Sequence, residues 1–516
     1  MFRANRRDFL ADVGRGMLAA SLGASLASEL QLAPAWAAEE PKSGVTFGDM
    51  EPLVDLLQET PADKLLPQLV AKIKGGLDLK TLTAAAAFAN ARAFGGNDYT
   101  GYHTFMALAP AYQMSLELPK EKRALPVLKV IYRNASRIQE TGHAASDTLQ
   151  VVTAAKPSAP QAATQDLRDA IHRVSYPDAE SVFAAIAQGT PGEAFQHLQW
   201  AVMEEVDVHR VVLAWRSWAM LNLTGQEHAH TLLRQSVRYC VQSEEYLKTR
   251  NRPRSDIRTL LPKLLDEHQL LDQPLGTKPL DDAAVEQLSQ VIFAGTRAQA
   301  AEAAASALGE GISPAVVGEA ISLAANQLVL HDPGRTAQNA SKGKPPGGVH
   351  GDSVGVHASD SANAWRNIAA ASGPRNAAAA LIVGAFHTAG QMGSKTPYPY
   401  AEQLDSIREK SAEALLAATD EAIRGKDQAR ACALVQTYGD QKHAVTPLSE
   451  LLLRYATSED GALHAEKYYR TVSEEFATTR PAYRWRQMIA LARVTASEYG
   501  FPAPGYQQAC ELLGVT

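Results

Sequence analysis

Cysteine is scarce in this chain, whose 516 residues include only Cys240, Cys432 and Cys510. An exported protein that depended on disulfides would need a larger and even number. The absence of a Cys-x-x-Cys-His segment excludes covalently attached c-type haem, and no cysteine cluster exists for an iron–sulfur centre or a structural zinc. Any bound cofactor must therefore have nitrogen and oxygen ligands, which draws attention to the 14 histidines.

Familiar nucleotide-binding and hydrolase motifs are also missing. The chain has no Walker A sequence, no GxGxxG ahead of a helix, no GxSxG and no HExxH, which removes the easily recognised nucleotide, dinucleotide, α/β-hydrolase and zincin classes. Its net charge of −6 provides no overall positive field to attract nucleic acid or an anionic membrane surface. We therefore expect no nucleic-acid partner.

The first 37 residues resemble a twin-arginine export signal. The segment Arg6-Arg7-Asp8-Phe9-Leu10 carries the paired arginines followed by Phe-Leu, and a weakly apolar run over residues 17–30 is too short to remain a membrane span. Ala35-Trp36-Ala37 then provides a small-x-small cleavage site. The resemblance implies export of the folded chain by the twin-arginine machinery, cleavage near Ala37, a periplasmic or secreted location and no stable membrane span.

Helical signals dominate the rest of the chain, and strand-like alternation with hairpin turns is hard to find. Segments rich in Ala, Leu, Gln, Glu and Arg show apolar spacings of three and four residues. These patterns predict an all-α protein, built as an array of packed antiparallel helices. The expected helices are Thr81–Phe94, Thr104–Leu118, Ala124–Glu140, Ala194–Leu223, His228–Glu245, Asp282–Leu308, Pro314–Leu330, Ala362–Ala371, Arg375–Thr388, Ala401–Arg424, Gln428–Tyr438, Pro447–Ala456, Leu463–Ala477 and Pro481–Tyr499.

The segment 331–360 differs from its surroundings because it is dense in Gly, Pro, Asn, Ser and His. An irregular insert of this length in a helical body is uncommon unless it is functional or disordered. We therefore divide the chain into a signal peptide (1–37), an N-terminal helical region (38–330), this His/Gly-rich loop, and a C-terminal helical region (361–516).

Three histidines near this loop are predicted to share a metal ion. His331 follows an apolar helix, His357 precedes the next helix, which we expect to begin near Ser359–Ser361, and His387 ends the helix after that. Irregular backbone meets a helix end at each place, so the three imidazoles could converge on iron or another ion with N/O ligands. In the alternative, they are independent structural residues.

His103 is a further candidate, because it lies in the first turn of a predicted helix after a Gly-Gly-Asn turn. The helix macrodipole disfavours a charged imidazole there, and the neutral form is the one that a metal site or a general base needs. We predict His103, His357 and Arg366 as catalytic residues, with Arg366 holding a substrate anion or carbonyl group.

Other polar residues have simpler interpretations. His209 and Glu205 lie four residues apart on one expected helix and would satisfy each other as a buried pair. Glu227-His228-Ala229-His230 has the Glu-x-x-His spacing of ferritin-like di-iron sites, and Glu140 precedes His143 by the same interval. An aromatic–basic cluster near the C-terminus could hold an anionic ligand or form a solvated helical surface. It comprises Tyr468, Tyr469, Arg470, Arg480, Tyr483, Arg484, Trp485 and Arg486.

The segment Val356–Arg366 resembles part of the questin oxidase-like proteins, in which a His leads a helix, and Tyr102-His103-Thr104 is similar to an early His-containing helix of that family. The resemblance implies an α-helical oxidoreductase with a histidine-lined pocket and an aromatic, polyketide-like substrate. Two alternatives stay open: a non-catalytic helical-array binding or scaffold protein of the periplasm, and a ferritin-like di-iron protein.

Overall fold

A computed structural model describes residues 44–141, 148–156, 162–271, 273–341, 343–391 and 400–515. The expected signal peptide, residues 1–37, lies outside these ranges. Within them the chain forms 23 α-helices and no β-strand, and only isolated β-bridges occur. The prediction of an all-α array of packed helices is confirmed.

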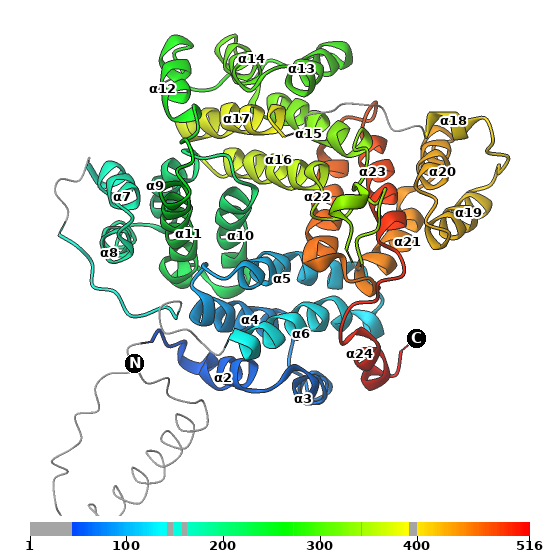
Figure 1. Ribbon diagram of the computed structural model, residues 1–516, viewed down its shortest axis with the longest axis horizontal. Helices are drawn as coiled ribbons and strands as arrows, with labels where there is room; N and C mark the ends of the chain where they lie inside the picture. Colours follow the sequence, from blue (N-terminus) through cyan, green and yellow to red (C-terminus); the bar gives the residue numbers. More distant parts are fainter. Residues whose placement is uncertain are drawn as a thin grey trace, which may run out of the picture.

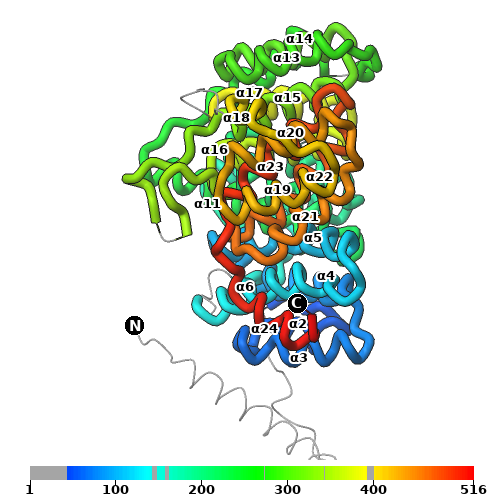
Figure 2. The backbone as a smooth tube through the Cα atoms, turned by 90° about the vertical axis from the view of Figure 1, so that its right-hand side faces the viewer, coloured from blue at the N-terminus to red at the C-terminus, as the bar shows by residue number. Residues whose placement is uncertain are grey.

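The helices stack in layers along the molecule (Figures 1 and 2). Helices α12 to α14 lie at one end, α15 to α17 follow, α5 and α4 come next, and α2, α3 and α24 close the other end. The bounds are α2 (Glu51–Glu59), α3 (Ala62–Lys74), α4 (Leu79–Phe94), α5 (Tyr99–Glu117), α6 (Ala124–Thr141), α7 (Ala163–His172), α8 (Tyr176–Ile186), α9 (Pro191–Val202), α10 (Val208–Thr224), α11 (Ala229–Thr249), α12 (Ile257–Glu267), α13 (Asp282–Ala294), α14 (Arg297–Gly309), α15 (Pro314–Leu330), α16 (Val354–Ala370), α17 (Pro374–Ala389), α18 (Ala401–Leu404), α19 (Ala412–Arg424), α20 (Gln428–Asp440), α21 (Val445–Ser458), α22 (His464–Thr478), α23 (Trp485–Glu498) and α24 (Tyr506–Leu513).

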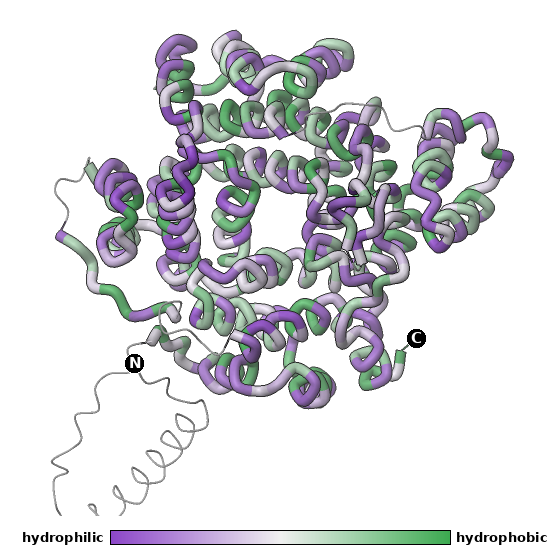
Figure 3. Tube along the Cα trace, viewed as in Figure 1, coloured by the Kyte–Doolittle hydropathy of each residue, from purple (hydrophilic) through white to green (hydrophobic). Residues whose placement is uncertain are grey.

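Two large hydrophobic clusters form most of the core. The larger one is contributed mainly by α2 to α17, and the smaller one joins α19 to α23 to the end of α15 and the start of α16. Helices α15 and α17 are apolar along most of their length (Figure 3), which fits their buried position between other helices. None of the described helices combines the length and the apolar character that crossing a bilayer would require.

Four helices near the middle of the molecule form a closed frame in Figure 1. Helix α10 packs against α5 and α16, and α22 packs against the same two helices from the other side. These four helices come from widely separated parts of the sequence, so tertiary packing alone brings their ends together.

Several helix boundaries differ from those that the sequence predicts. The expected helix 194–223 is two helices, because the chain turns after α9 and Asp207 begins α10 as its N-cap. The segments 282–308 and 401–424 are likewise divided, by the Gly295-Thr296 turn and by the residues after Leu404. Helix α16 begins at Val354 rather than near residue 360, because the Ser353 side chain accepts a hydrogen bond from the Val356 amide and caps it.

Candidate functional site

Four histidines from the four frame helices meet in one cluster. Each lies in the first or second turn of its helix: His103 on α5, His209 on α10, His357 on α16 and His464 on α22. Their ring centroids form a closed circuit, with separations of 4.8 Å between His103 and His209 and 5.5 Å between His209 and His357. The circuit continues with 5.2 Å from His357 to His464 and 5.1 Å from His464 back to His103. We call this group the histidine cluster.

Side-chain caps explain why three of these helices begin where they do. The Asp98 carboxylate accepts a hydrogen bond from the Gly101 amide at 2.6 Å, and Asp207 accepts one from the His209 amide at 2.7 Å. Ser353 has the same role for α16. Each cap satisfies amides that a helix end leaves free, and each fixes the direction from which a cluster histidine enters.

The fourth helix begins differently, and His464 is its first residue. Gly461, Ala462 and Leu463 all have positive φ values of 48°, 47° and 68°. Two of these residues carry side chains, for which left-handed backbone is uncommon and costs energy, and such strain concentrates at functional sites. The loop backbone also passes close by, since a Cβ on Gly351 would lie 2.1 Å from the Cβ of His464.

Hydrogen bonds at Nδ1 fix the tautomer of three cluster rings. The Nδ1 atom of His103 lies 2.8 Å from the Tyr99 carbonyl oxygen, and that of His464 lies 3.1 Å from the Ala462 carbonyl oxygen. A carbonyl oxygen only accepts, so each Nδ1 carries the proton. The His209 Nδ1 faces an Asp207 carboxylate oxygen at 3.3 Å in the same way. In the neutral rings, all three Nε2 atoms are therefore left with a lone pair.

The Nε2 atoms of His103 and His209 are buried, and no described residue forms a hydrogen bond with either of them. The Nε2 of His464 lies 3.1 Å from the Nε2 of His357, which donates the proton between them. Unpartnered buried acceptors cost free energy, so the arrangement needs either a donor or a cation at its centre.

Burial keeps three of the four rings neutral. It lowers the pKa of His357 to about 3, and it lowers the pKa of His103 and His464 well below the ordinary value of a histidine. The positive charge of buried Lys467 on α22 acts in the same direction on all three pKa values. Burial also lowers the pKa of Lys467 itself, to about 8.

Aromatic side chains border the cluster on one side. The ring centroid of Tyr99 lies 4.4 Å from that of His103, and the ring of Tyr102 lies 5.4 Å from that of His209. Tyr99 is 57% exposed, whereas His103 and His464 are each 2% exposed. The cluster is therefore closest to solvent on the side of Tyr99.

The spacing of the rings suits a single metal ion. With metal–nitrogen bonds of about 2.0–2.1 Å, imidazoles on one ion have neighbouring ring centroids roughly 4.5–5.5 Å apart. Metal-binding histidines typically donate their other ring N–H to a carbonyl or carboxylate group, as three of these rings do. In the described part of the chain, however, no three His, Cys, Asp or Glu side chains already surround one point as ligands. Ligation would require the rings to rotate until their Nε2 atoms converge, and the Nε2 proton of His357 to move to Nδ1 or to leave.

The structure brings together two of the predicted site residues, His103 and His357, but not the predicted metal trio. His331 caps the end of α15 and contacts the ring of Phe293. His387 accepts a hydrogen bond at Nδ1 from the Trp365 indole at 3.2 Å. Trp365 lies eight residues beyond His357, about 12 Å along α16, so the end of α17 meets a different level of that helix.

Arg366 lies away from the cluster as well. Its guanidinium forms an ion pair with Glu475, and its Cγ would lie 3.0 Å from a Cβ on Gly318. It therefore joins α16 to α22 and packs against α15, rather than facing the histidines as a substrate ligand.

The expected pairing of His209 with Glu205 is also wrong. Glu205 accepts a hydrogen bond from the Ser255 amide and lies 3.5 Å from Arg258, whereas His209 faces Asp207. The chain turns between Glu205 and α10, so the four-residue spacing does not place both side chains on one helix face.

The ferritin-like alternative finds no ligand set among the described residues. Burial lowers the pKa of His230 to about 4, and its ring stacks near Phe183. His143, the partner in the second Glu-x-x-His segment, lies outside the described residues.

The sequence did not predict that His209 and His464 lie in the histidine cluster. Both follow the pattern that identified His103, namely a turn or capping residue directly ahead of a helix with a histidine in its first turns. Asp207 precedes His209, and Asp460-Gly461 precedes His464. This common position was the available signal.

No protein-family model, curated protein or solved structure matches the chain. The resemblance to questin oxidase-like proteins therefore rests on the two short segments that contain His103 and His357.

Proposed function

We propose that this protein is a metal-dependent oxidoreductase that binds one iron or copper ion through His103, His209, His357 and His464. The observation that carries the proposal is the shared tautomer of His103, His209 and His464. Each of these rings has its Nδ1 proton engaged by a fixed acceptor, and among the described residues the Nε2 atoms of His103 and His209 have no hydrogen-bond partner. Burying imidazole lone pairs at the starts of four helices costs free energy unless the lone pairs bind a common cation.

The donor set supports a redox metal. Imidazole suits Fe, Cu, Zn and Ni, and four neutral imidazoles do not cancel any of the positive charge of the ion. An ion with four protein ligands can accept a further ligand when it is five- or six-coordinate. Tyr99, which is 57% exposed, offers aromatic surface beside the cluster, where the aromatic substrate that the family resemblance implies could stack.

Metal analysis of the purified full-length protein tests the proposal. We expect about one equivalent of iron or copper per chain, and less than a tenth of that in the double variant His103→Gln/His464→Gln. The double variant His331→Gln/His387→Gln is the matched control, because it removes two histidines outside the cluster, and it should retain the metal. Circular dichroism would verify that each variant is folded.

The ferrous or cuprous protein should also react with dioxygen or bind nitric oxide, with a change in its electron paramagnetic resonance spectrum. A zinc ion that stays inert would identify a structural site and reject the oxidoreductase. If the protein binds no iron, copper or zinc after reconstitution, the non-catalytic helical scaffold becomes the better interpretation.

A further inference from the structure

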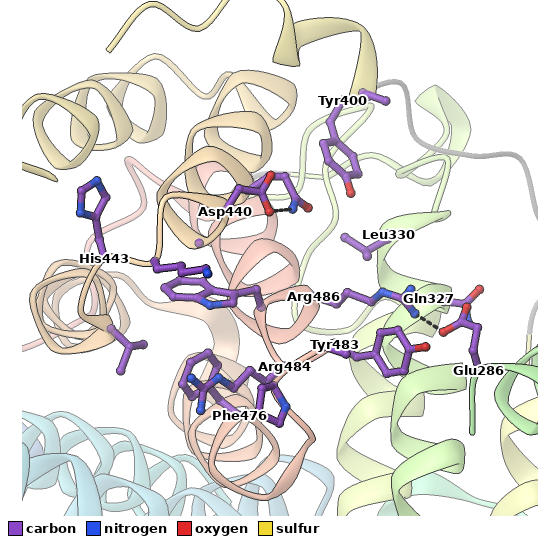
Figure 4. A pocket seen from close by; sticks show the side chains of 18 of the residues that line it. Glu286, Gln327, Leu330, Tyr400, Asp440, His443, Phe476, Tyr483, Arg484 and Arg486 are labelled. Carbon is purple, nitrogen blue, oxygen red and sulfur yellow. Dashed lines mark hydrogen bonds and ion pairs between the residues drawn. The ribbon is translucent and has the colours of Figure 1, made fainter. Parts of the chain in front are cut away.

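One cavity of the molecule lies apart from the histidine cluster. It is a cleft of about 1080 Å³ between α13, α15, α20 and the segment that joins α22 to α23 (Figure 4). None of the four cluster histidines lines it. Its volume is that of a site for a drug-sized molecule.

One wall of the cleft is aromatic and rigidly held. The Trp485 indole packs edge-on against Phe476, with ring centroids 5.4 Å apart and an angle of 83°. The Trp485 indole also lies against Gly439 of α20, where an added Cβ would come within 2.5 Å of the indole. Gly439 therefore permits a contact that a larger residue would block, and the indole is fixed before any ligand enters.

Two arginines in the cleft differ in their partners. Arg486 stacks on Tyr483 and forms an ion pair with Glu286 at 2.7 Å, so its charge is balanced. Arg484 instead folds over Phe476, with its Cζ atom 5.1 Å from the ring centroid (Figure 4). Among the described residues no carboxylate forms an ion pair with Arg484, and its buried Nε has no hydrogen-bond partner.

The other charges of the cleft do not neutralise Arg484. Asp440 accepts a hydrogen bond from Gln436 at 2.8 Å, and Lys442 adds a second cation at the exposed rim. A guanidinium stacked on an aromatic ring keeps its N–H edge available in the plane of the stack, where it can donate two parallel hydrogen bonds to a carboxylate.

We propose that this cleft binds a planar aromatic carboxylate, with its rings against Trp485 and its carboxylate on Arg484. The size of the cleft suits two or three fused rings rather than one. The inference does not depend on a metal in the histidine cluster.

Isothermal titration calorimetry of the full-length protein with 2-naphthoate tests this site. We expect one molecule bound per chain, and binding at least tenfold weaker for the uncharged 2-naphthylmethanol and for the non-planar cyclohexanecarboxylate. Arg484→Gln should weaken naphthoate binding at least tenfold, because a charge-assisted hydrogen-bond pair is lost. The matched control Arg173→Gln removes an arginine between α7 and α8 and should leave the affinity unchanged.

Gly439→Ala provides a second test, because it displaces the indole without changing any charge, and it should also weaken naphthoate binding. The proposal would be overturned if naphthoate does not bind at millimolar concentration. It would also be overturned if the Arg484→Gln variant is folded and binds naphthoate as tightly as the unmodified protein. The double variant His103→Gln/His464→Gln should bind naphthoate like the unmodified protein. Loss of binding in that variant would place the ligand at the histidine cluster and reject the cleft.

Discussion

Acidification should destabilise this protein through His387, a buried histidine outside the cluster. Burial lowers its pKa to about 4, and its Nδ1 accepts the Trp365 indole proton, so the folded state holds the neutral ring. The unfolded chain has an ordinary histidine pKa of about 6.5. Between these two values the unfolded state binds the extra proton, so this contribution to stability is present above pH 6.5 and is lost as the pH falls. From pH 7 to pH 5 the loss from this one residue is about 2 kcal/mol.

The variant His387→Gln isolates that contribution. Glutamine can still accept the indole hydrogen bond, but it does not titrate, and the other buried histidines affect both proteins alike. Urea denaturation at pH 7 and at pH 5 measures how far the unfolding free energy falls between the two pH values. This fall should be about 2 kcal/mol smaller in the variant than in the unmodified protein. The pH dependence of Trp365→Phe should lie between those of the variant and the unmodified protein, because loss of the indole donor makes the Nδ1 of His387 easier to protonate. Equal pH dependence in the variant and the unmodified protein would refute the reasoning.

Three further outcomes are expected. Lys129→Met should lower the unfolding free energy by about 3–5 kcal/mol in urea denaturation, because Lys129 and Glu466 form an ion pair at 2.7 Å with 1% and 0% of their side chains exposed. Adding Glu466→Gln should recover part of this loss. His209→Ala should remove metal but cost less than about 2 kcal/mol, since Asp207, which faces His209, keeps its hydrogen bonds from the backbone amide of residue 209 and from the Tyr239 hydroxyl; a larger loss would make this histidine structural. Replacing Arg6 and Arg7 together by Lys should leave the precursor in the cytoplasm, as cell fractionation would show, because the export receptor distinguishes guanidinium from ammonium groups; normal export would contradict the localisation.

The helical fold could be predicted from apolar spacing, because each helix buries a stripe or a whole surface against its neighbours. The residues at which the helices begin and end could be predicted less well. Ser359 and Asp360 look like capping residues in the sequence, yet both are buried inside α16, and the helix begins at the earlier cap Ser353. A single sequence offers two competing caps, and packing against neighbouring helices decides between them.

The candidate site was predictable only in part. His103 and His357 stood out because each follows a turn and begins a helix. His464 also follows a turn, at Asp460-Gly461, but the left-handed backbone of Ala462 and Leu463 that sets its direction is not indicated by their residue types. His331 was grouped with His357 because the two are near in sequence, but helices that run past each other bring distant residues together and separate close ones.

The order in which the ribosome delivers the four rings gives the histidine cluster a further property. His103 emerges early, and His464 emerges close to the end of the chain; at 5–20 residues per second, the interval is roughly 20–70 s. During that time the nascent protein can bury much of the larger hydrophobic cluster, while His464 is still missing from the histidine cluster. A chain that stops before α22 cannot complete the cluster at all. Occupancy of the four histidines by an ion would therefore distinguish finished, fully folded molecules from every truncated or partly folded one.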